Sequence, residues 1–201
     1  MKPRENGVWK ISNEKLSLQR ILESAEKVAE NAKLDSRQSM HLRLLAEELV
    51  EMLPSLLAFT EGEFWIVDEG KTFELHTVLT PKEAITTERR DELLSVSSSG
   101  KNAAATGIMA KIRLTAMFMI IDYEKNAAEY PFATDFYHDG MGANPNFIIP
   151  SWSLEQYRAK VKSEQGEKWD ELEKSIIANI ADDVVVGIEG RRVEIIVRKA
   201  F

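Results

Sequence analysis

The sequence predicts an α/β fold, because segments with helical periodicity alternate with pairs of strand-like segments. Residues 14–33 and 35–57 repeat apolar side chains every three to four positions, as amphipathic helices do. Residues 63–79 and 183–199 each hold two strand-like runs around a short turn that contains glycine, which is typical of a β-hairpin. A chain of 201 residues, 44% of them apolar, can bury a substantial core. We therefore expect a single domain over residues 1–201.

The elements of the first half follow from local sequence. Residues 7–12 resemble a short edge strand, and Asn13 can cap the first helix. Asp35 or Ser36 can cap the second helix, and the two alternatives remain open. The apolar stripe of the second helix consists of Leu42, Leu45, Leu49, Met52, Leu53 and Leu56. Strands are expected at 63–68 and 72–79, and the second alternates Phe73, Leu75, Thr77 and Leu79 on one side.

The second half combines helices with an irregular segment. A polar helix over 81–96 is followed by a break at 97–102 and then by a helix of small residues. Aromatic residues, prolines and glycines are concentrated at about 122–152, which predicts an irregular insertion that acts as a lid or a packed surface loop. Ser151 or Ser153 then caps a charged helix that reaches about residue 180, with Gly166 as a candidate break. The chain is expected to close with strands at 183–188 and 192–199.

Composition excludes several classes of function. A net charge of −7 argues against general nucleic-acid binding, which needs a basic face for the phosphates. The absence of cysteine removes disulfides, thiolate nucleophiles and cysteine metal sites. The first fifteen residues have no apolar signal core, and no apolar run is long enough to cross a bilayer. We expect a cytoplasmic protein that binds neither nucleic acid nor a membrane.

Glu48 is the candidate catalytic residue. At 100° per residue it lies about 90° from the centre of the apolar stripe, where the core surface of the second helix meets a cleft. Burial at a cleft would raise its pKa and suit it to act as a general base or to contact a ligand. The alternative is a flanking residue that pairs with a lysine or an arginine.

The candidate anion site lies around the break that precedes the small-residue helix. Amides at a helix N-terminus together with a lysine suit a phosphate or a carboxylate, and the residues concerned are Ser98, Ser99, Gly100, Lys101 and Asn102. The alternative is a serine-rich turn in which Ser99 or Asn102 only caps the helix. Gly107 lies within this helix, where glycine costs about 1 kcal/mol relative to alanine, so close packing or a ligand should compensate.

A metal site is the weaker interpretation of the acidic residues in the insertion. Asp135, His138 and Asp139 offer mixed oxygen and nitrogen ligands. Acids in such loops more often cap turns, and we therefore predict no metal site.

The order of elements and four segments of the chain resemble the GHKL ATPase superfamily, specifically its branch of anti-sigma factors and histidine-kinase ATPase domains. The segments are VWKIS, LRLLAEELVEML, GKNAAATGIMAKI and VVVGIEGRRVEIIVRK. The resemblance implies a two-layer sandwich in which a mixed, mostly antiparallel sheet packs on helices. It also implies ATP or ADP as the ligand, with Glu48 orienting the attacking water and the segment around Gly100 and Gly107 covering the phosphates.

Two departures from the family pattern bear on activity. Met52 stands where the family has its magnesium-binding asparagine, and a thioether is a poor ligand for this hard cation, so magnesium binding is not expected. Residues 76–81 hold neither the adenine-binding aspartate nor the glycines of the family. We expect a regulatory protein that binds an adenine nucleotide or a similar anion without efficient phosphoryl transfer. If it is active, it would be an ATPase or a protein kinase of the anti-sigma-factor type.

The alternative hypothesis is a non-catalytic interaction module that has lost nucleotide binding. A regulatory protein partner or a second copy of the chain would then dock on the charged helix and the aromatic insertion.

Overall fold

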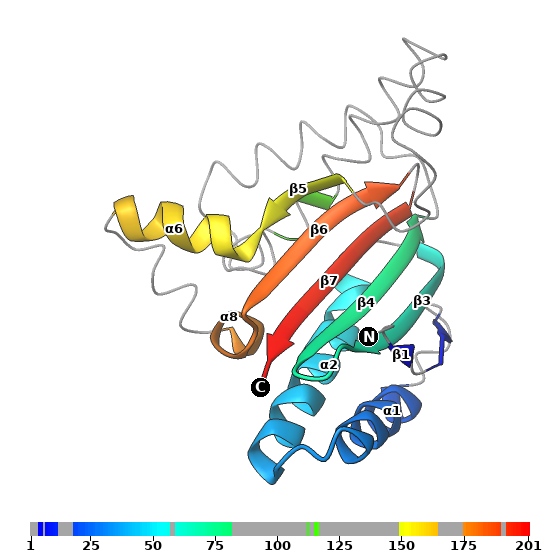
Figure 1. The fold of residues 1–201 in the computed structure, drawn as a ribbon. Helices are drawn as coiled ribbons and strands as arrows, with labels where there is room; N and C mark the ends of the chain where they lie inside the picture. Colours follow the sequence, from blue (N-terminus) through cyan, green and yellow to red (C-terminus); the bar gives the residue numbers. More distant parts are fainter. Residues whose placement is uncertain are drawn as a thin grey trace.

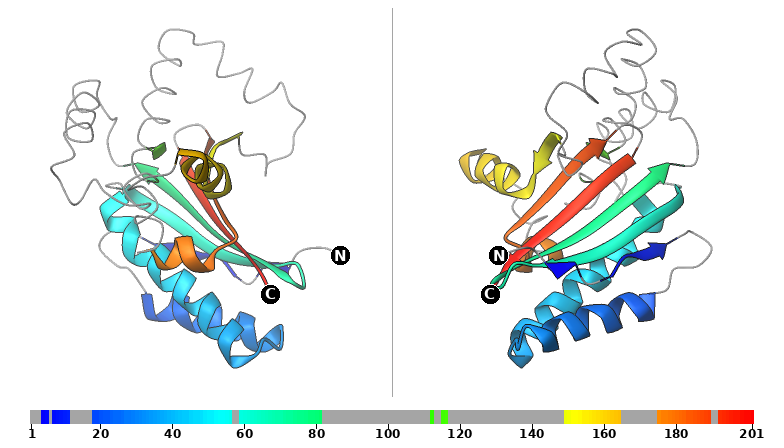
Figure 2. Two further views of the ribbon diagram at one scale, coloured as in Figure 1. Left: turned by 90° about the vertical axis from the view of Figure 1, so that its left-hand side faces the viewer. Right: turned by 45° about the vertical axis from the view of Figure 1, so that its right-hand side comes forward.

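Antiparallel strands form one sheet, and two long helices cover one of its faces (Figures 1 and 2). The computed structural model describes residues 4–5, 7–11, 18–56, 59–81, 112, 115–116, 149–164, 175–189 and 192–201. The sheet has seven strands in the order β1-β3-β4-β7-β6-β5, with β2 also paired to β3. This architecture confirms the expected α/β class and agrees with a sandwich of helices on a mostly antiparallel sheet.

The N-terminal half of the sheet is built around a hairpin. Strand β3 (Phe59–Asp68) and strand β4 (Thr72–Pro81) pair antiparallel, and both are longer than the sequence predicts. Gly70 adopts a φ of +91° in the turn, and its amide donates to the Asp68 carboxylate at 2.7 Å. Strands β1 (Arg4–Glu5) and β2 (Trp9–Ile11) lie along the same edge of β3, and β2 confirms the predicted edge strand.

The second of the two long helices begins where polar side chains satisfy free backbone amides. Helix α1 (Leu18–Asn31) precedes helix α2 (Ser36–Leu56). The Asp35 carboxylate accepts hydrogen bonds from the amides of Arg37 and Gln38 at 2.8 and 2.9 Å. The Gln38 side chain accepts one from the Asp35 amide at 3.0 Å, which completes a reciprocal capping box. Asp35 is therefore the cap of α2, and this decides between the two predicted candidates.

The C-terminal half differs from prediction at one strand. Its elements are β5 (Ile149–Ser153), α6 (Leu154–Glu164), α8 (Ile176–Ile180), β6 (Asp183–Glu189) and β7 (Arg192–Ala200). The predicted closing hairpin is confirmed. The sequence places residues 149–152 in the irregular insertion, but they lie in strand β5, which pairs with β6. The run IPSWS shows no clear alternation and contains a proline, which strands tolerate mainly at sheet edges.

Helix α6 begins as the sequence predicts and α8 stands apart from it. The Ser153 hydroxyl accepts a hydrogen bond from the Gln156 amide at 3.2 Å, so Ser153 is the cap of α6. The sequence predicts a charged helix up to about residue 180 with a candidate break at Gly166, which lies outside the described residues. At the end of this range the structure has a separate helix, α8, with its own cap at Ser175.

The two halves of the chain meet in the middle of the sheet. Residues Thr72–Leu79 of β4 pair with Val193–Ala200 of β7, and we call this β4–β7 pairing the seam. In Figure 1 the red strand β7 lies directly beside the green strand β4. The seam therefore brings together strands that are more than a hundred residues apart in the sequence.

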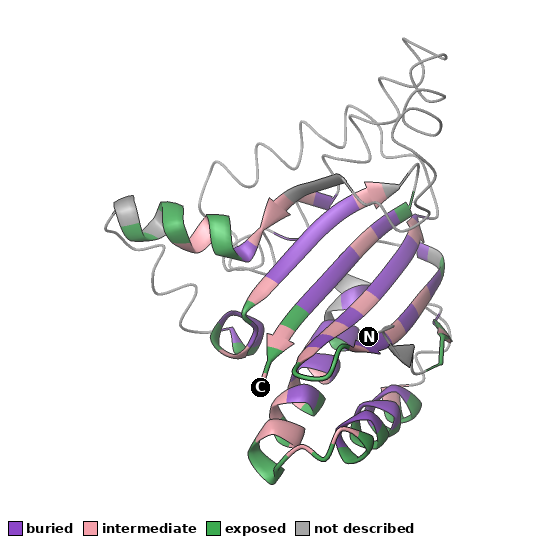
Figure 3. Cartoon of the chain, in the orientation of Figure 1, coloured by how far each residue is buried: buried purple, intermediate pink, exposed green. Residues whose placement is uncertain are grey.

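The core fills the space between the sheet and helices α1 and α2 (Figure 3). On α2 the buried side chains include Leu42, Leu45, Leu49 and Leu53, which confirms these members of the predicted stripe. On β4 the inward residues are Phe73, Leu75, Thr77 and Leu79, as the alternation predicts. Ile112 and Ala116, from the predicted small-residue helix, are also buried in this core.

The remaining sequence predictions lie outside the described residues. They concern the cap at Asn13, the polar helix after residue 81, the 97–102 break, Gly107 and the insertion up to residue 148. Within the part of the chain that the structure describes, no helix is both long and apolar enough to cross a membrane.

Candidate functional site

Glu48 lies on the flank of α2 and faces the start of helix α8. The Ile177 amide donates to one carboxylate oxygen of Glu48 at 2.6 Å, and the Ser175 hydroxyl contacts the other at 3.4 Å. Ser175 also caps α8 itself, because its hydroxyl accepts from the Ala178 amide at 3.2 Å. The first amides of a helix have no partner within the helix. Glu48 thus satisfies a donor that the backbone of α8 leaves free.

The electrostatic environment of Glu48 combines burial with hydrogen bonding. Burial raises the pKa of Glu48 above its ordinary value, and the negative charge of Glu51 acts in the same direction. The hydrogen bonds from Ile177, Ser175 and Ile176 oppose this rise in pKa without cancelling it. Among the described residues its hydrogen-bond partners are these neutral donors, whereas the alternative interpretation expected a lysine or an arginine. Glu48 is therefore a desolvated acid that meets the amide-rich start of a helix.

The opposite end of α8 is also held by a charged side chain. Arg158 of α6 donates to the carbonyl oxygens of Asp182 at 2.8 Å and Ala181 at 3.1 Å, and also to that of Ala178. A negative charge near a helix N-terminus and a positive charge near its C-terminus both favour the helix dipole. The sequence contains no signal for Arg158, because its partners are backbone carbonyls about twenty positions away.

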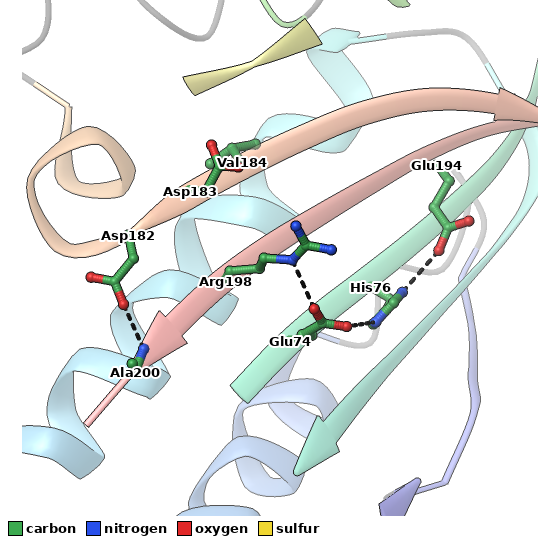
Figure 4. A network of polar contacts seen from close by, with 8 residues as sticks. All are labelled: Glu74, His76, Asp182, Asp183, Val184, Glu194, Arg198 and Ala200. Carbon is green, nitrogen blue, oxygen red and sulfur yellow. Dashed lines mark hydrogen bonds and ion pairs between the residues drawn. The ribbon is translucent and has the colours of Figure 1, made fainter. Parts of the chain in front are cut away.

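A second polar cluster lies on the opposite face of the sheet, and sequence reasoning missed it (Figure 4). His76 contacts Glu194 through Nδ1 at 2.8 Å and Glu74 through Nε2 at 3.1 Å. The Arg198 guanidinium donates to the other oxygen of Glu74 at 2.7 Å. The Trp65 ring stacks on His76 with centroids 4.8 Å apart and planes 13° apart. We call these five residues the His76 network.

The members of the His76 network shift one another's ionisation. The hydrogen bond from His76, helped by Arg198 and opposed by burial, lowers the pKa of Glu74 to about 2. Burial lowers the pKa of His76, but the hydrogen bonds and negative charges of Glu194 and Glu74 together outweigh it and leave that pKa raised. Glu74 and His76 alternate with core residues of β4, which is a signal for the outward face. Their partners on β7 depend on the register of the seam, which no local signal indicates.

Of the predicted site residues, only Glu48 falls among the described residues. The predicted anion site, Ser98, Ser99, Gly100, Lys101 and Asn102, lies outside them, as do Gly107 and the loop acids Asp135 and Asp139 with His138. Within the described ranges, no group of three or more histidine, aspartate or glutamate side chains could hold a metal ion.

Comparison of the chain with models of protein families, with curated proteins and with solved structures finds no match. The description of the fold as two helices on an antiparallel sheet therefore rests on the structure of this chain alone.

Proposed function

We propose that this chain is a cytoplasmic regulatory protein with a GHKL-like fold that binds ATP, ADP or a similar anion without efficient phosphoryl transfer. The position of Glu48 is the observation that supports this most directly. The acid that the resemblance selects lies half-buried at the edge of the helix layer, turned from the apolar stripe toward another part of the chain. The order of the elements and the two helices on one face of an antiparallel sheet also support it.

The chemistry around Glu48 favours binding over hydrolysis. A glutamate that orients an attacking water must point acceptor positions of its carboxylate at that water. A carboxylate has about four such positions, and that of Glu48 faces α8, where Ile177 and Ser175 donate to its two oxygens. Met52, one turn further along α2, supplies no oxygen for magnesium. We therefore assign the phosphates to Lys101 and the amides around it, and assign no turnover to Glu48.

The test is thermal unfolding with ATP or ADP, each with and without magnesium. At a free nucleotide concentration 100 times its Kd, binding should stabilise the protein by about 2.7 kcal/mol. For a domain of this size the midpoint should rise by about 5 to 10 °C. We expect the same rise without magnesium, its loss in Lys101→Ala, and its retention in Lys27→Ala, a control at an exposed lysine of α1.

Two outcomes would contradict the proposal. No shift for the wild-type protein with either nucleotide would remove the nucleotide claim. A shift in Lys101→Ala equal to that of the wild type would leave binding in place and remove the assignment of the site.

The hydrogen bonds that Glu48 accepts from Ser175 and Ile177 favour a second candidate function, that of a non-catalytic interaction module. In this case the contact with α8 is structural, and a regulatory partner or a second copy of the chain docks on α6 and the aromatic segment. Light scattering over a range of concentrations should then show a dimer, or a pull-down should recover a partner. A concentration-independent monomer without a partner would count against it.

A further inference from the structure

The His76 network connects the two halves of the chain across the seam. Glu74 and His76 belong to β4, whereas Glu194 and Arg198 belong to β7. The contact between His76 and Glu194 joins residues 118 positions apart, and that between Glu74 and Arg198 joins residues 124 positions apart. All four side chains lie on the sheet face opposite α2, as Figure 4 shows. The network therefore ties β4 to β7 in addition to their backbone ladder.

The geometry around His76 favours the charged form of its ring. A neutral imidazole has one N–H donor and one acceptor, whereas the imidazolium has two donors. Both ring nitrogens lie within hydrogen-bond distance of a carboxylate, and an ionised carboxylate can only accept. The face of the Trp65 indole, stacked at 4.8 Å, also favours a cation. These three contacts are all made best when His76 carries two protons.

The charges of the His76 network sum to zero only when His76 is protonated. Glu74 and Glu194 contribute two negative charges, and Arg198 and protonated His76 contribute two positive ones. Loss of the proton from His76 leaves one negative charge uncompensated. The side chains of His76 and Glu194 are only 12% and 13% exposed, so water screens that charge poorly.

Among the described residues of the neighbouring strands, no other cation contacts Glu194 in place of the imidazolium. On β3 the outward Glu63 pairs with Arg192 of β7 at 3.7 Å. On β6 the outward Asp183 accepts from the amides of Glu155 and Val184. The other outward side chains nearby are apolar and buried, namely Val67, Val78, Val185 and Ile196. Among the described groups, the second positive charge that the two carboxylates need therefore comes from protonated His76.

We propose that the His76 network is a pH-sensitive clasp across the seam, closed when His76 is protonated and loosened when it loses a proton. A neutral imidazole can donate to only one carboxylate, so one of the two links is lost. The pKa of His76 is raised relative to the ordinary value of about 6.5 that an unfolded chain has. The stabilisation is therefore complete below pH 6.5 and is lost as the pH rises through the folded-state pKa.

A proton NMR titration of the histidine ring protons tests the protonation state directly. The chain has three histidines, so His41→Gln and His138→Gln identify the His76 signal by elimination. We expect His76 to titrate above pH 6.5, and to titrate at a lower pH in Glu194→Gln, which removes one negative charge. A His76 signal that titrates at or below pH 6.5 would overturn the proposal.

Urea unfolding between pH 6 and 9 tests the clasp. Relative to His76→Gln, the unfolding equilibrium constant of the wild type should rise with pH, by up to about tenfold for each unit by which the folded pKa exceeds the unfolded one. His41→Gln should follow the wild type. A constant difference between the wild type and His76→Gln over this range would mean that His76 only packs in the sheet. If His76→Gln does not fold, Glu194→Gln takes its place, and a pH dependence equal to that of the wild type would be the contradicting result.

Discussion

Two glutamates of this protein have opposite pKa shifts although both are about half-buried. Burial dominates at Glu48, whose partners are a backbone amide and a hydroxyl, and its pKa rises. At Glu74 the hydrogen bond from His76 and the charge of Arg198 dominate, and the pKa falls to about 2. A charged donor stabilises a carboxylate more than a neutral one does. The charge of the hydrogen-bond donor, more than the extent of burial, therefore decides the direction in which the pKa of each carboxylate shifts.

Removal of the Glu48 carboxylate should destabilise the protein through α8. In Glu48→Ala the amide of Ile177, a fully buried residue, loses its partner, which should cost about 1–3 kcal/mol in the free energy of unfolding. Glu48→Gln keeps an acceptor oxygen and should cost less. Glu51→Ala, at an exposed position of the same helix, should stay within about 0.5 kcal/mol of the wild type. Urea unfolding measures all three, and equal costs for Glu48→Ala and Glu51→Ala would show that the contact adds no stability.

At the scale of the elements, strand β3 depends on a glycine where three strands pack closely. Gly62 lies between Ile11 of β2 and Leu79 of β4. A Cβ atom at position 62 would lie 2.8 Å from Leu79 Cδ2, 2.9 Å from Ile11 Cγ1 and 2.9 Å from the carbonyl oxygen of Val78. The last of these is a backbone atom of the central strand β4, so the crowding cannot be relieved by a side-chain rotation alone.

Gly62→Ala should therefore destabilise the sheet. Overpacking of a filled core costs about 1–3 kcal/mol, and we expect a loss of that size in the free energy of unfolding. Glu61→Ala, at the exposed neighbouring position of β3, serves as the control and should change stability by less than about 0.5 kcal/mol. Chemical unfolding measures both variants. A Gly62→Ala protein as stable as the wild type would show that β2 and β4 can both shift to accommodate the added methyl group.

In the molecule as a whole, the seam is the junction on which the fold depends. The strands β1 to β4 with helices α1 and α2 come from the first part of the chain, and β5 to β7 with α6 and α8 come from the last part. Three sets of contacts join these two parts: the β4–β7 ladder, the contact of Glu48 with α8 on the helix-covered face of the sheet, and the His76 network on the opposite face. The two halves are thus held together on both faces of the sheet.

Amide hydrogen exchange should be slowest in the strands that form the seam. Strands β4 and β7 have a neighbour on each side, whereas β5 forms one edge of the sheet and β2 lies along the other. Amides that exchange only on global opening belong to the most buried elements. We expect the slowest exchange in β4 and β7 and faster exchange in β5 and β2, measured by mass spectrometry or NMR. Protection of β5 equal to that of β7 would contradict this order.

Much of the local structure could be predicted from the sequence. The alternation from Phe73 to Leu79 predicts which face of β4 is buried, and the stripe from Leu42 to Leu53 predicts the buried face of α2. Strand β5 could not be predicted, because Pro150 and its neighbours lack alternation and acquire strand structure by pairing with β6. The flank position of Glu48 could be predicted, but its partner at α8 could not.

The sequence by itself determined helices α1 and α2, the two hairpins and the faces that they bury, because these depend on side-chain periodicity and on capping groups within a few residues. Only the tertiary structure decided that β4 lies beside β7, that Glu48 meets α8, and that His76 lies between Glu74 and Glu194. The physical reason is distance along the chain. Contacts between residues more than a hundred positions apart depend on the register and packing of whole elements, and no local pattern of side chains specifies that register.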